Sequence, residues 1–319
     1  MTVTVALAGD TMLGRSVARA LATTPPEALV APEVRAAIGQ ADLVVLNLEC
    51  CISERGRPWP APGKPFFFRA PPRVVELLVL LGTDCVTLAN NHALDYGLDA
   101  LADTLDHLAM AGIAVVGAGA DLEQASRPVV LAAGGLRVAV LGVTDHPADF
   151  AADPDRPGVA FADLARQVPD WLRQTVREAD AEVMLVTPHW GPNMTSAPVR
   201  HVRRAATALV EAGATLVAGH SAHVPHGVAG PVLYDLGDFL DDYRVDPQLR
   251  NDLGLLFLVT LDGRGPIRLE ALPLKLEYCH TRLATGDDIA WMRRRFRAAC
   301  ADLGTTVEEA AGRLLISWR

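Results

Sequence analysis

The sequence predicts an α/β fold with two β-sheets flanked by helices. Short apolar runs typical of buried strands alternate with segments whose apolar residues recur at helical spacing. This alternation favours parallel strands covered by helices, and the strand signals are more numerous than one sheet usually accommodates. Half of the 319 residues are hydrophobic and only 5% are aromatic, so we expect a core of Ala, Val and Leu side chains.

The predicted elements follow one another along the chain. Strand signals lie at residues 3–8, 43–46, 84–89, 113–116, 129–132, 138–143, 183–187, 216–218, 232–234 and 255–261. Helical patterns are clearest at residues 72–81, 98–111, 164–178 and 199–212. The Pro-rich residues 57–65 and the Asp- and Pro-rich residues 146–157 predict surface loops, and we expect the second loop to overhang a site.

We expect one domain over residues 1–282, followed by a helical extension over residues 283–319 that packs on it. The extension is predicted to contain helices at residues 287–300 and 306–315. Packing is the default role for this extension, and substrate recognition is the alternative.

Composition excludes several classes of function. A net charge of -9 argues against nucleic acid or an anionic membrane as the main partner. The five cysteines are odd in number and lack CxxC spacing, which favours a reducing compartment over a disulfide framework or a thiolate zinc site. The N-terminus lacks the pattern of a signal peptide, and no run approaches the ~18 apolar residues of a spanning helix. We therefore expect a soluble, cytoplasmic protein.

The most informative stretch is residues 88–97, where polar side chains follow a predicted buried strand. Asn90, Asn91, His92 and Asp95 lie on the turn between this strand and the next helix. Open α/β sheets bind their ligands at the carboxyl ends of their strands. Amide, imidazole and carboxylate groups gathered there therefore predict a functional site.

Other predicted strands also end in polar residues. Taken singly, each has an ordinary structural interpretation, such as a helix N-cap for Asp10, a loop acid for Glu49 or a buried imidazole for His189. Because the carboxyl ends of neighbouring parallel strands meet at one edge, the recurrence favours a metal or acid/base site. The residues at these ends are Asp10, Glu49, His189, His220, His223, Asp235 and Asp238.

These motifs together resemble the CapA family of poly-γ-glutamate capsule biosynthesis proteins, a branch of the calcineurin-like metallophosphatase fold. The resemblance covers roughly residues 3–275 and is carried by AGDTMLGR (8–15), NLEC (47–50), ANNHALDYG (89–97), GAGADLEQA (117–125), HWG (189–191), GHSAHV (219–224) and YDLGDF (234–239). It implies a sandwich of two β-sheets with the site at the carboxyl ends of the strands. It also implies that His92 matches the transition-state histidine of metallophosphatases.

The departures from the phosphatase pattern imply a reduced metal site. Met12 stands where a phosphatase motif has histidine, Glu49 replaces the bridging aspartate, and Ser221 occupies a usual ligand position. We therefore expect one divalent metal rather than two. The predicted ligands are Asp10, Glu49, Asn90 and Asn91, and such oxygen ligands favour Ca²⁺, with Mg²⁺ or Mn²⁺ as alternatives.

The remaining polar residues are candidates for acid/base catalysis, because an imidazole paired with a carboxylate is a competent base near neutral pH. The catalytic candidates are His92, His189, His220, His223, Asp10, Asp95 and Asp238. Spacing alone leaves open which pairs form. Trp59, Trp190 and Phe68 are predicted to hold an apolar part of the substrate, although packing is an alternative for the aromatic residues.

The function predicted first is Cα epimerisation of a residue in a peptide. The chain is similar to CapA-like proteins encoded beside lasso-peptide precursors, some of which are metal-dependent peptide epimerases. Metal-dependent hydrolysis of a phosphoester, or of an amide such as a γ-glutamyl bond, is the alternative. A non-catalytic role in polymer export or assembly is the third hypothesis. The expected partner is a peptide, and the sequence predicts no oligomeric state.

Overall fold

The computed structural model describes residues 1–318 and confirms the α/β fold with two main sheets. The larger sheet has ten strands, with the order β19-β20-β17-β16-β1-β2-β5-β6, while β15 pairs with β1 and β18 with β17. Its strands are β1 (Val3–Thr11), β2 (Leu43–Leu48), β5 (Cys85–Thr87), β6 (Ala114–Val116), β15 (Asp238–Leu240), β16 (Leu253–Asp262), β17 (Gly265–Glu277), β18 (His280–Leu283), β19 (Glu308–Ala310) and β20 (Arg313–Ser317).

The second main sheet has six strands in the order β13-β14-β12-β11-β9-β8. These are β8 (Val129–Ala133), β9 (Leu136–Thr144), β11 (Val183–His189), β12 (Leu216–Ala218), β13 (Val228–Ala229) and β14 (Val232–Leu233). Two short strand pairs lie outside the main sheets, β3 (Cys51–Ile52) with β4 (Arg69–Ala70) and β7 (Ala118–Gly119) with β10 (Gly158–Val159).

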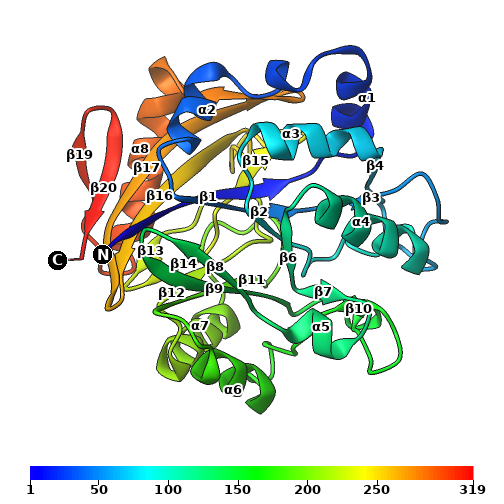
Figure 1. The fold of residues 1–319 in the computed structure, drawn as a ribbon. Coiled ribbons are helices and arrows are strands. Elements are labelled where there is room, and N and C mark those ends of the chain that lie inside the picture. Colours follow the sequence, from blue (N-terminus) through cyan, green and yellow to red (C-terminus); the bar gives the residue numbers. More distant parts are fainter. Residues whose placement is uncertain (319) are drawn as a thin grey trace.

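Helices cover the outer faces of the two sheets (Figure 1). On the side of the larger sheet are α1 (Arg15–Thr23), α2 (Pro32–Ile38), α3 (Val75–Leu80) and α4 (Leu98–Met110). The six-stranded sheet carries α6 (Asp170–Glu178) and α7 (Arg200–Ala212), while α5 (Leu122–Ser126) lies beside β7 and β10. The last helix, α8 (Gly286–Ala301), packs against β13, β16 and β17.

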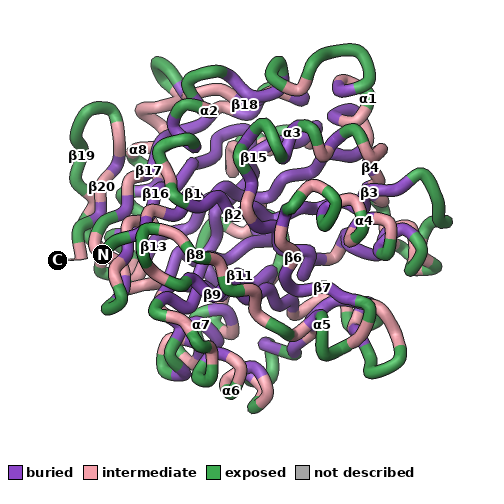
Figure 2. The backbone as a smooth tube through the Cα atoms, viewed as in Figure 1, coloured by how far each residue is buried: buried purple, intermediate pink, exposed green. Residues whose placement is uncertain are grey.

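The buried apolar side chains form layers that match this sandwich. One layer lies between the sheets and joins Leu7 of β1 and Phe257 of β16 to Val140 of β9 and Leu185 of β11. Separate layers lie between each sheet and its helices. The strands in the middle of the molecule are accordingly buried along almost their whole length (Figure 2). Within residues 1–318, no helix is long and apolar enough to cross a membrane.

Two predicted helices differ from the structure. The pattern at residues 164–178 forms a helix only from Asp170, because Pro169 disfavours helical backbone at the residue before it. The helix predicted at residues 306–315 is wrong, since this segment forms the hairpin of β19 and β20. The hairpin turns at Gly312, whose φ is +82°, and β20 pairs with β17. The helix predicted at residues 287–300 is confirmed as α8.

Strand register brings the polar strand ends together. Asp10 at the end of β1 lies opposite Asp238 of β15 and opposite Asn47 of β2. His189 at the end of β11 forms a parallel bridge with His220. Gly9 of β1 allows β15 to approach closely, because a Cβ at Gly9 would lie 1.8 Å from the carbonyl oxygen of Gly237, directly before β15. The two sheets thus place their carboxylates and imidazoles at one shared edge.

Candidate metal centre and adjoining cavity

Asp10 lies at the middle of the polar cluster. Its Oδ1 accepts hydrogen bonds from Asn47 Nδ2 at 2.8 Å and interacts with His220 Nδ1 at 2.9 Å. Its Oδ2 lies 3.3 Å from His223 Nδ1. His223 Nδ1 also lies 2.8 Å from Asp238 Oδ1. Asn47 lies on β2, Asp238 lies on β15, and both histidines lie on the loop after β12, so the geometry depends on the assembled sandwich.

Glu49 and His189 form a second contact beside Asp10. His189 Nε2 lies 2.9 Å from Glu49 Oε1, and both side chains are buried. Asn47 Nδ2 also donates to Glu49 Oε1 at 3.3 Å. The amide of Asn47 therefore bridges Asp10 and Glu49 and holds the two carboxylates beside each other.

The donor atoms of this cluster fit a metal ion. Two groups, Asp10–His223–Asp238 and Asp10–Glu49–His189, each have ligand atoms within 4.8 Å of one another. Within residues 1–318, several buried atoms of the cluster have no hydrogen-bond partner, namely Asp238 Oδ2, His189 Nδ1 and Asn91 Oδ1. Because unpaired buried oxygens are costly, a cation would relieve them. These two groups could therefore hold a metal ion, and the identity of the ion stays a prediction.

The pKa values of the cluster reflect burial and crowding of charge. Burial alone would raise the pKa of Asp10, but hydrogen bonds from His220 and His223 hold it well below its ordinary value. Burial raises the pKa of Glu49, and the charge of Asp10 adds to this effect. Burial likewise raises the pKa of Asp238, whereas the carboxylates around His223 raise the pKa of that imidazole despite its burial. A divalent cation bound here would instead favour the charged form of the Asp238 carboxylate.

The turn after β5 contains two asparagines with different surroundings. Asn90 Nδ2 donates to Asn47 Oδ1 and to the carbonyl oxygen of Leu48, both at 2.9 Å, while Asn90 Oδ1 accepts the backbone N–H of His92 at 3.0 Å. Asn90 therefore braces the turn. Asn91 Nδ2 lies 3.3 Å from His92 Nε2, while its buried Oδ1 has no hydrogen-bond partner among residues 1–318, which suits a ligand. The structure brings both residues to the cluster, and their role as ligands stays a prediction.

His92 is held by Asp95 in a second dyad on the same turn. His92 Nδ1 lies 2.6 Å from Asp95 Oδ2, and the His92 ring stacks on Phe68 with the centroids 4.0 Å apart. Asp95 Oδ2 also accepts the backbone N–H of Phe68 at 2.6 Å, and Asp95 Oδ1 pairs with Lys64 Nζ at 2.9 Å. Asp95 therefore fixes His92 and the loop of residues 57–65 at once.

A cavity of about 420 Å³ opens beside the two dyads. His92 and His223 both line it, and its walls include Phe68, Tyr243 and Arg15. Arg15 pairs with Asp242, and its guanidinium lies over the rings of Phe68 and Tyr243 at 5.1 and 5.6 Å. The cavity thus combines an aromatic wall with two imidazoles that are each hydrogen-bonded to a carboxylate.

The structure places the three predicted substrate-binding residues in different surroundings. Phe68 lines the cavity. Trp59 lies outside this lining and packs edge-on against Phe150, with its Nε1 donating to Asp149 Oδ2 at 2.7 Å. Trp190 is buried in the apolar layer beside α7 and donates to the carbonyl oxygen of Tyr234 at 3.0 Å. Trp190 faces away from His189 because successive residues of a strand point to opposite sides.

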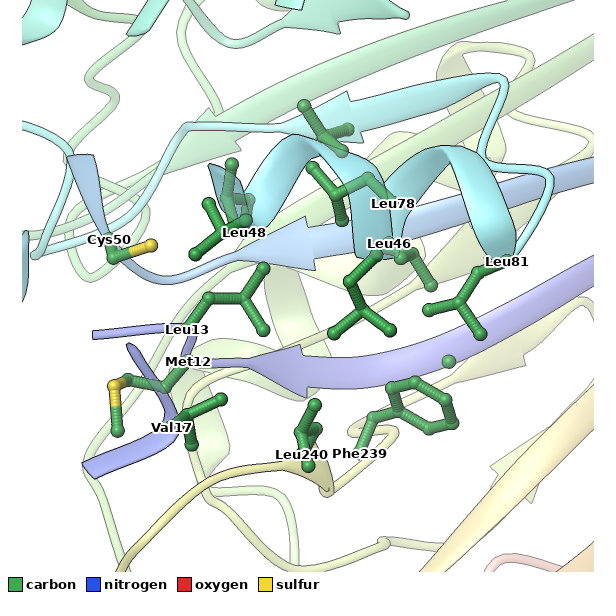
Figure 3. Packing of buried hydrophobic residues seen from close by; sticks show 14 of the residues in the cluster. Met12, Leu13, Val17, Leu46, Leu48, Cys50, Leu78, Leu81, Phe239 and Leu240 are labelled. Atoms are coloured by element: carbon green, nitrogen blue, oxygen red, sulfur yellow. The ribbon is translucent and has the colours of Figure 1, made fainter. Parts of the chain in front are cut away.

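Two of the three residues that depart from the phosphatase pattern, Met12 and Ser221, lie outside the ligand groups, whereas Glu49 belongs to one of them. Met12 is buried in the apolar layer, where Figure 3 shows it with Leu13 and Val17. The backbone N–H of Gly14 lies 3.1 Å from the Met12 sulfur. Ser221 has a φ of +110° and donates its hydroxyl to the carbonyl oxygen of Gly191 at 3.0 Å. Both side chains therefore have structural contacts.

Sequence reasoning missed four residues of the site. Asn47 lies within the NLEC motif but was not singled out, and Lys64 lies in a Pro-rich stretch that reads as an ordinary surface loop. Tyr243 follows β15 and carries no motif signal. His146 lies at the end of β9, with its ring 5.0 Å from that of His189 and its Nδ1 2.5 Å from Asp145 Oδ1. The Asp-His pair at a strand end was an available signal for this last contact.

Comparison with known proteins assigns the family. The family described as "Bacterial capsule synthesis protein PGA_cap" matches residues 4–243. A "Probable polyglutamine synthesis accessory protein" of Mycobacterium tuberculosis is 34% identical over 294 residues, which cover 86% of this chain and 76% of that protein. The "PGA biosynthesis protein CapA" of Bacillus subtilis is 30% identical over 243 residues, covering 73% of this chain and 62% of that protein. The chain therefore belongs to the CapA family of capsule synthesis proteins and has its calcineurin-like metallophosphatase fold.

Proposed function

We propose that this chain is a metal-dependent acid/base enzyme that epimerises the Cα of one residue in a ribosomal precursor peptide of the lasso type. The observation that carries the proposal is that two His–carboxylate dyads, His92–Asp95 and His223–Asp238, line one cavity. Epimerisation needs a base on one face of Cα and an acid on the other. The free and buried state of all five cysteines fits action in the cytoplasm.

In this mechanism one imidazole removes the Cα proton, and the C–H electron pair moves into the peptide carbonyl to give an enolate. The second imidazole, in its protonated form, then delivers a proton to the opposite face of Cα. Nδ1 of His92 donates to Asp95 and Nδ1 of His223 donates to Asp238, so Nε2 is the ring nitrogen that would transfer the proton. Nε2 of His92 also lies 3.3 Å from Asn91 Nδ2, a contact that the substrate would replace. Asp10, Glu49 and Asn91 would hold a divalent metal, which when bound would supply positive charge that stabilises an enolate.

Hydrolysis by the same site is the second candidate. It is favoured by the two possible ligand groups that share Asp10, because a pair of metals can stabilise the attacking and leaving oxygens together. The relatives named for polyglutamine synthesis and PGA biosynthesis support an amide of the γ-glutamyl type as its substrate. Phosphoesters are the alternative hydrolytic substrate.

The test is incubation in deuterium oxide with the precursor peptide encoded beside the gene and with synthetic γ-glutamyl and phosphoester substrates. Mass spectrometry and chiral amino-acid analysis would follow the products, with and without a chelator. We expect one deuteron at an intact backbone, formation of one D-residue and loss of both signals on chelation. Cleavage or phosphate release without a D-residue would contradict the epimerase proposal and support the hydrolase.

A further inference from the structure

Tyr243 lines the cavity but belongs to neither His–carboxylate dyad. It follows β15, and its backbone N–H donates to Asp241 Oδ1 at 2.8 Å. Its ring lies edge-on to His223, with the centroids 5.3 Å apart, and 5.9 Å from the ring of Phe68. Because Phe68 stacks on His92, Tyr243 lies on the wall that joins the two imidazoles.

The hydroxyl of Tyr243 is an available donor. Among the described residues that line the cavity, Tyr243 alone carries a hydroxyl. The hydroxyl lies 3.4 Å from Glu49 Oε2, which is longer than the roughly 2.5–3.0 Å of a strong O–H···O hydrogen bond. The hydroxyl is therefore a donor that remains weakly engaged.

Proton abstraction from Cα creates a need for such a donor. As the Cα–H bond breaks, negative charge develops on the peptide carbonyl oxygen. A hydrogen-bond donor held in place in a buried site stabilises this developing negative charge. Removal of one such donor typically lowers turnover by about 10²–10³-fold.

We propose that Tyr243 is a catalytic residue whose hydroxyl donates a hydrogen bond to the substrate carbonyl oxygen as the enolate forms. The inference rests on the proposed epimerisation and adds the donor that this reaction requires. The hydroxyl leaves its long contact with Glu49 and turns to the substrate oxygen. It keeps its proton throughout, so no further acid or base is needed.

The experiment compares Tyr243→Phe with wild-type protein in the deuterium oxide assay. The variant keeps the ring contacts with His223 and Phe68 and loses only the hydroxyl. We expect kcat and the rate of deuterium incorporation to fall together by about 10²–10³-fold. We expect KM to change by less than about threefold, and metal affinity measured by calorimetry to stay at the wild-type value, because no binding contact is removed.

Tyr96→Phe is the matched control, because its ring packs against Phe67 and beneath Arg69 outside this cavity. Its kinetics should equal those of wild type. An unchanged kcat in Tyr243→Phe, or a change in KM alone, would overturn the role of Tyr243. A matching loss of metal affinity would also overturn it, because the hydroxyl would then act through Glu49. Absence of any D-residue with wild-type protein would instead overturn the proposed function and this inference with it.

Discussion

The two dyads that line the cavity have the same composition and contrasting surroundings. Asp95 is met by a lysine, a backbone N–H and His92, so its charge is balanced inside the protein. Asp238 instead lies among other acids, with Asp10 directly opposite in the neighbouring strand. Its Oδ2 has no hydrogen-bond partner among the described residues, and burial raises its pKa.

This difference gives the two aspartates different roles: Asp95 holds His92 in place, and Asp238 contributes negative charge to the cluster. The charge of Asp95 is paired with Lys64, and Asp95 fixes the His92 ring and the loop that carries Lys64. The Asp238 side carries more negative charge than the protein compensates, which is the usual state of a metal centre without its cation. The contrast predicts that the two sides respond differently to substitution, metal and pH.

The largest effect is expected from removing the central residues of either side. Asp10→Ala, His92→Ala and His223→Ala should each lower turnover by about 10²–10⁴-fold, because each removes a proton-transfer group or its main partner. The circular dichroism spectrum should stay native, since these side chains lie outside the apolar layers. Normal turnover in all three variants would show that the site lies elsewhere.

Addition of a divalent cation should stabilise the folded protein through the Asp238 side of the cavity. At a free Ca²⁺ concentration of 100 times Kd, binding adds about 2.7 kcal/mol to the free energy of unfolding. Thermal unfolding with Ca²⁺, Mg²⁺, Mn²⁺ or chelator would measure the gain for each ion. Asp238→Asn should show a smaller gain, whereas Asp84→Asn, on a carboxylate that accepts the Val44 N–H, should respond like wild type. Equal midpoints for wild type under all four conditions would contradict a metal centre.

Loss of Lys64 should lower the free energy of unfolding through the Asp95 side of the cavity. Lys64→Met leaves the buried Asp95 Oδ1 without its cation while Asp95 Oδ2 keeps its donors, and we expect a loss of about 1–3 kcal/mol in urea unfolding. Arg137→Met is the control, because Arg137 forms exposed pairs with Asp180 and Glu182. Exposed pairs contribute about 0–1 kcal/mol. Equal losses in the two variants would show that Lys64 does not hold Asp95 in place.

The smallest expected effect is a pH dependence that belongs to the Asp238 side. A carboxyl group whose pKa is raised on folding adds stability that is fully present below its unfolded pKa of about 3.9 and is lost as pH rises through the folded value. In chelator, the unfolding free energy of wild type should therefore fall relative to Asp238→Asn as pH rises above about 4. Excess Ca²⁺ should reduce this difference. A difference that grows with pH in favour of wild type would reverse the sign and contradict the raised pKa.

Much of the strand and helix pattern followed from local sequence. The short β-branched runs around Val86 and Val217 became buried parallel strands, because such runs suit strands covered on both faces. The hairpin at residues 308–317 was missed because its glutamates and alanines favour a helix locally. Pairing of Leu314 and Ile316 with β17 overrides that preference.

The sequence predicted where the candidate site lies, but it did not predict which side chains pair with each other. Asp10, Glu49, His189 and His223 come together as expected, since the carboxyl ends of parallel strands meet at one edge. Lys64 could not be assigned, because its partner Asp95 is 31 positions away, beyond β4, α3 and β5, and the Pro-rich stretch that carries Lys64 has no regular period. The position of Trp190 could have been deduced from the alternation of side chains along β11.

The sequence by itself determined which residues end the strands and hence which chemical groups gather at the edge of the sandwich. Hydrophobic periodicity is a local property, so it specifies the elements and their polar ends without any knowledge of their partners. Only the tertiary structure decided that His92 pairs with Asp95, that His223 pairs with Asp238 and that Tyr243 lies between them. These contacts depend on strand register and loop placement, which arise when distant segments pack together.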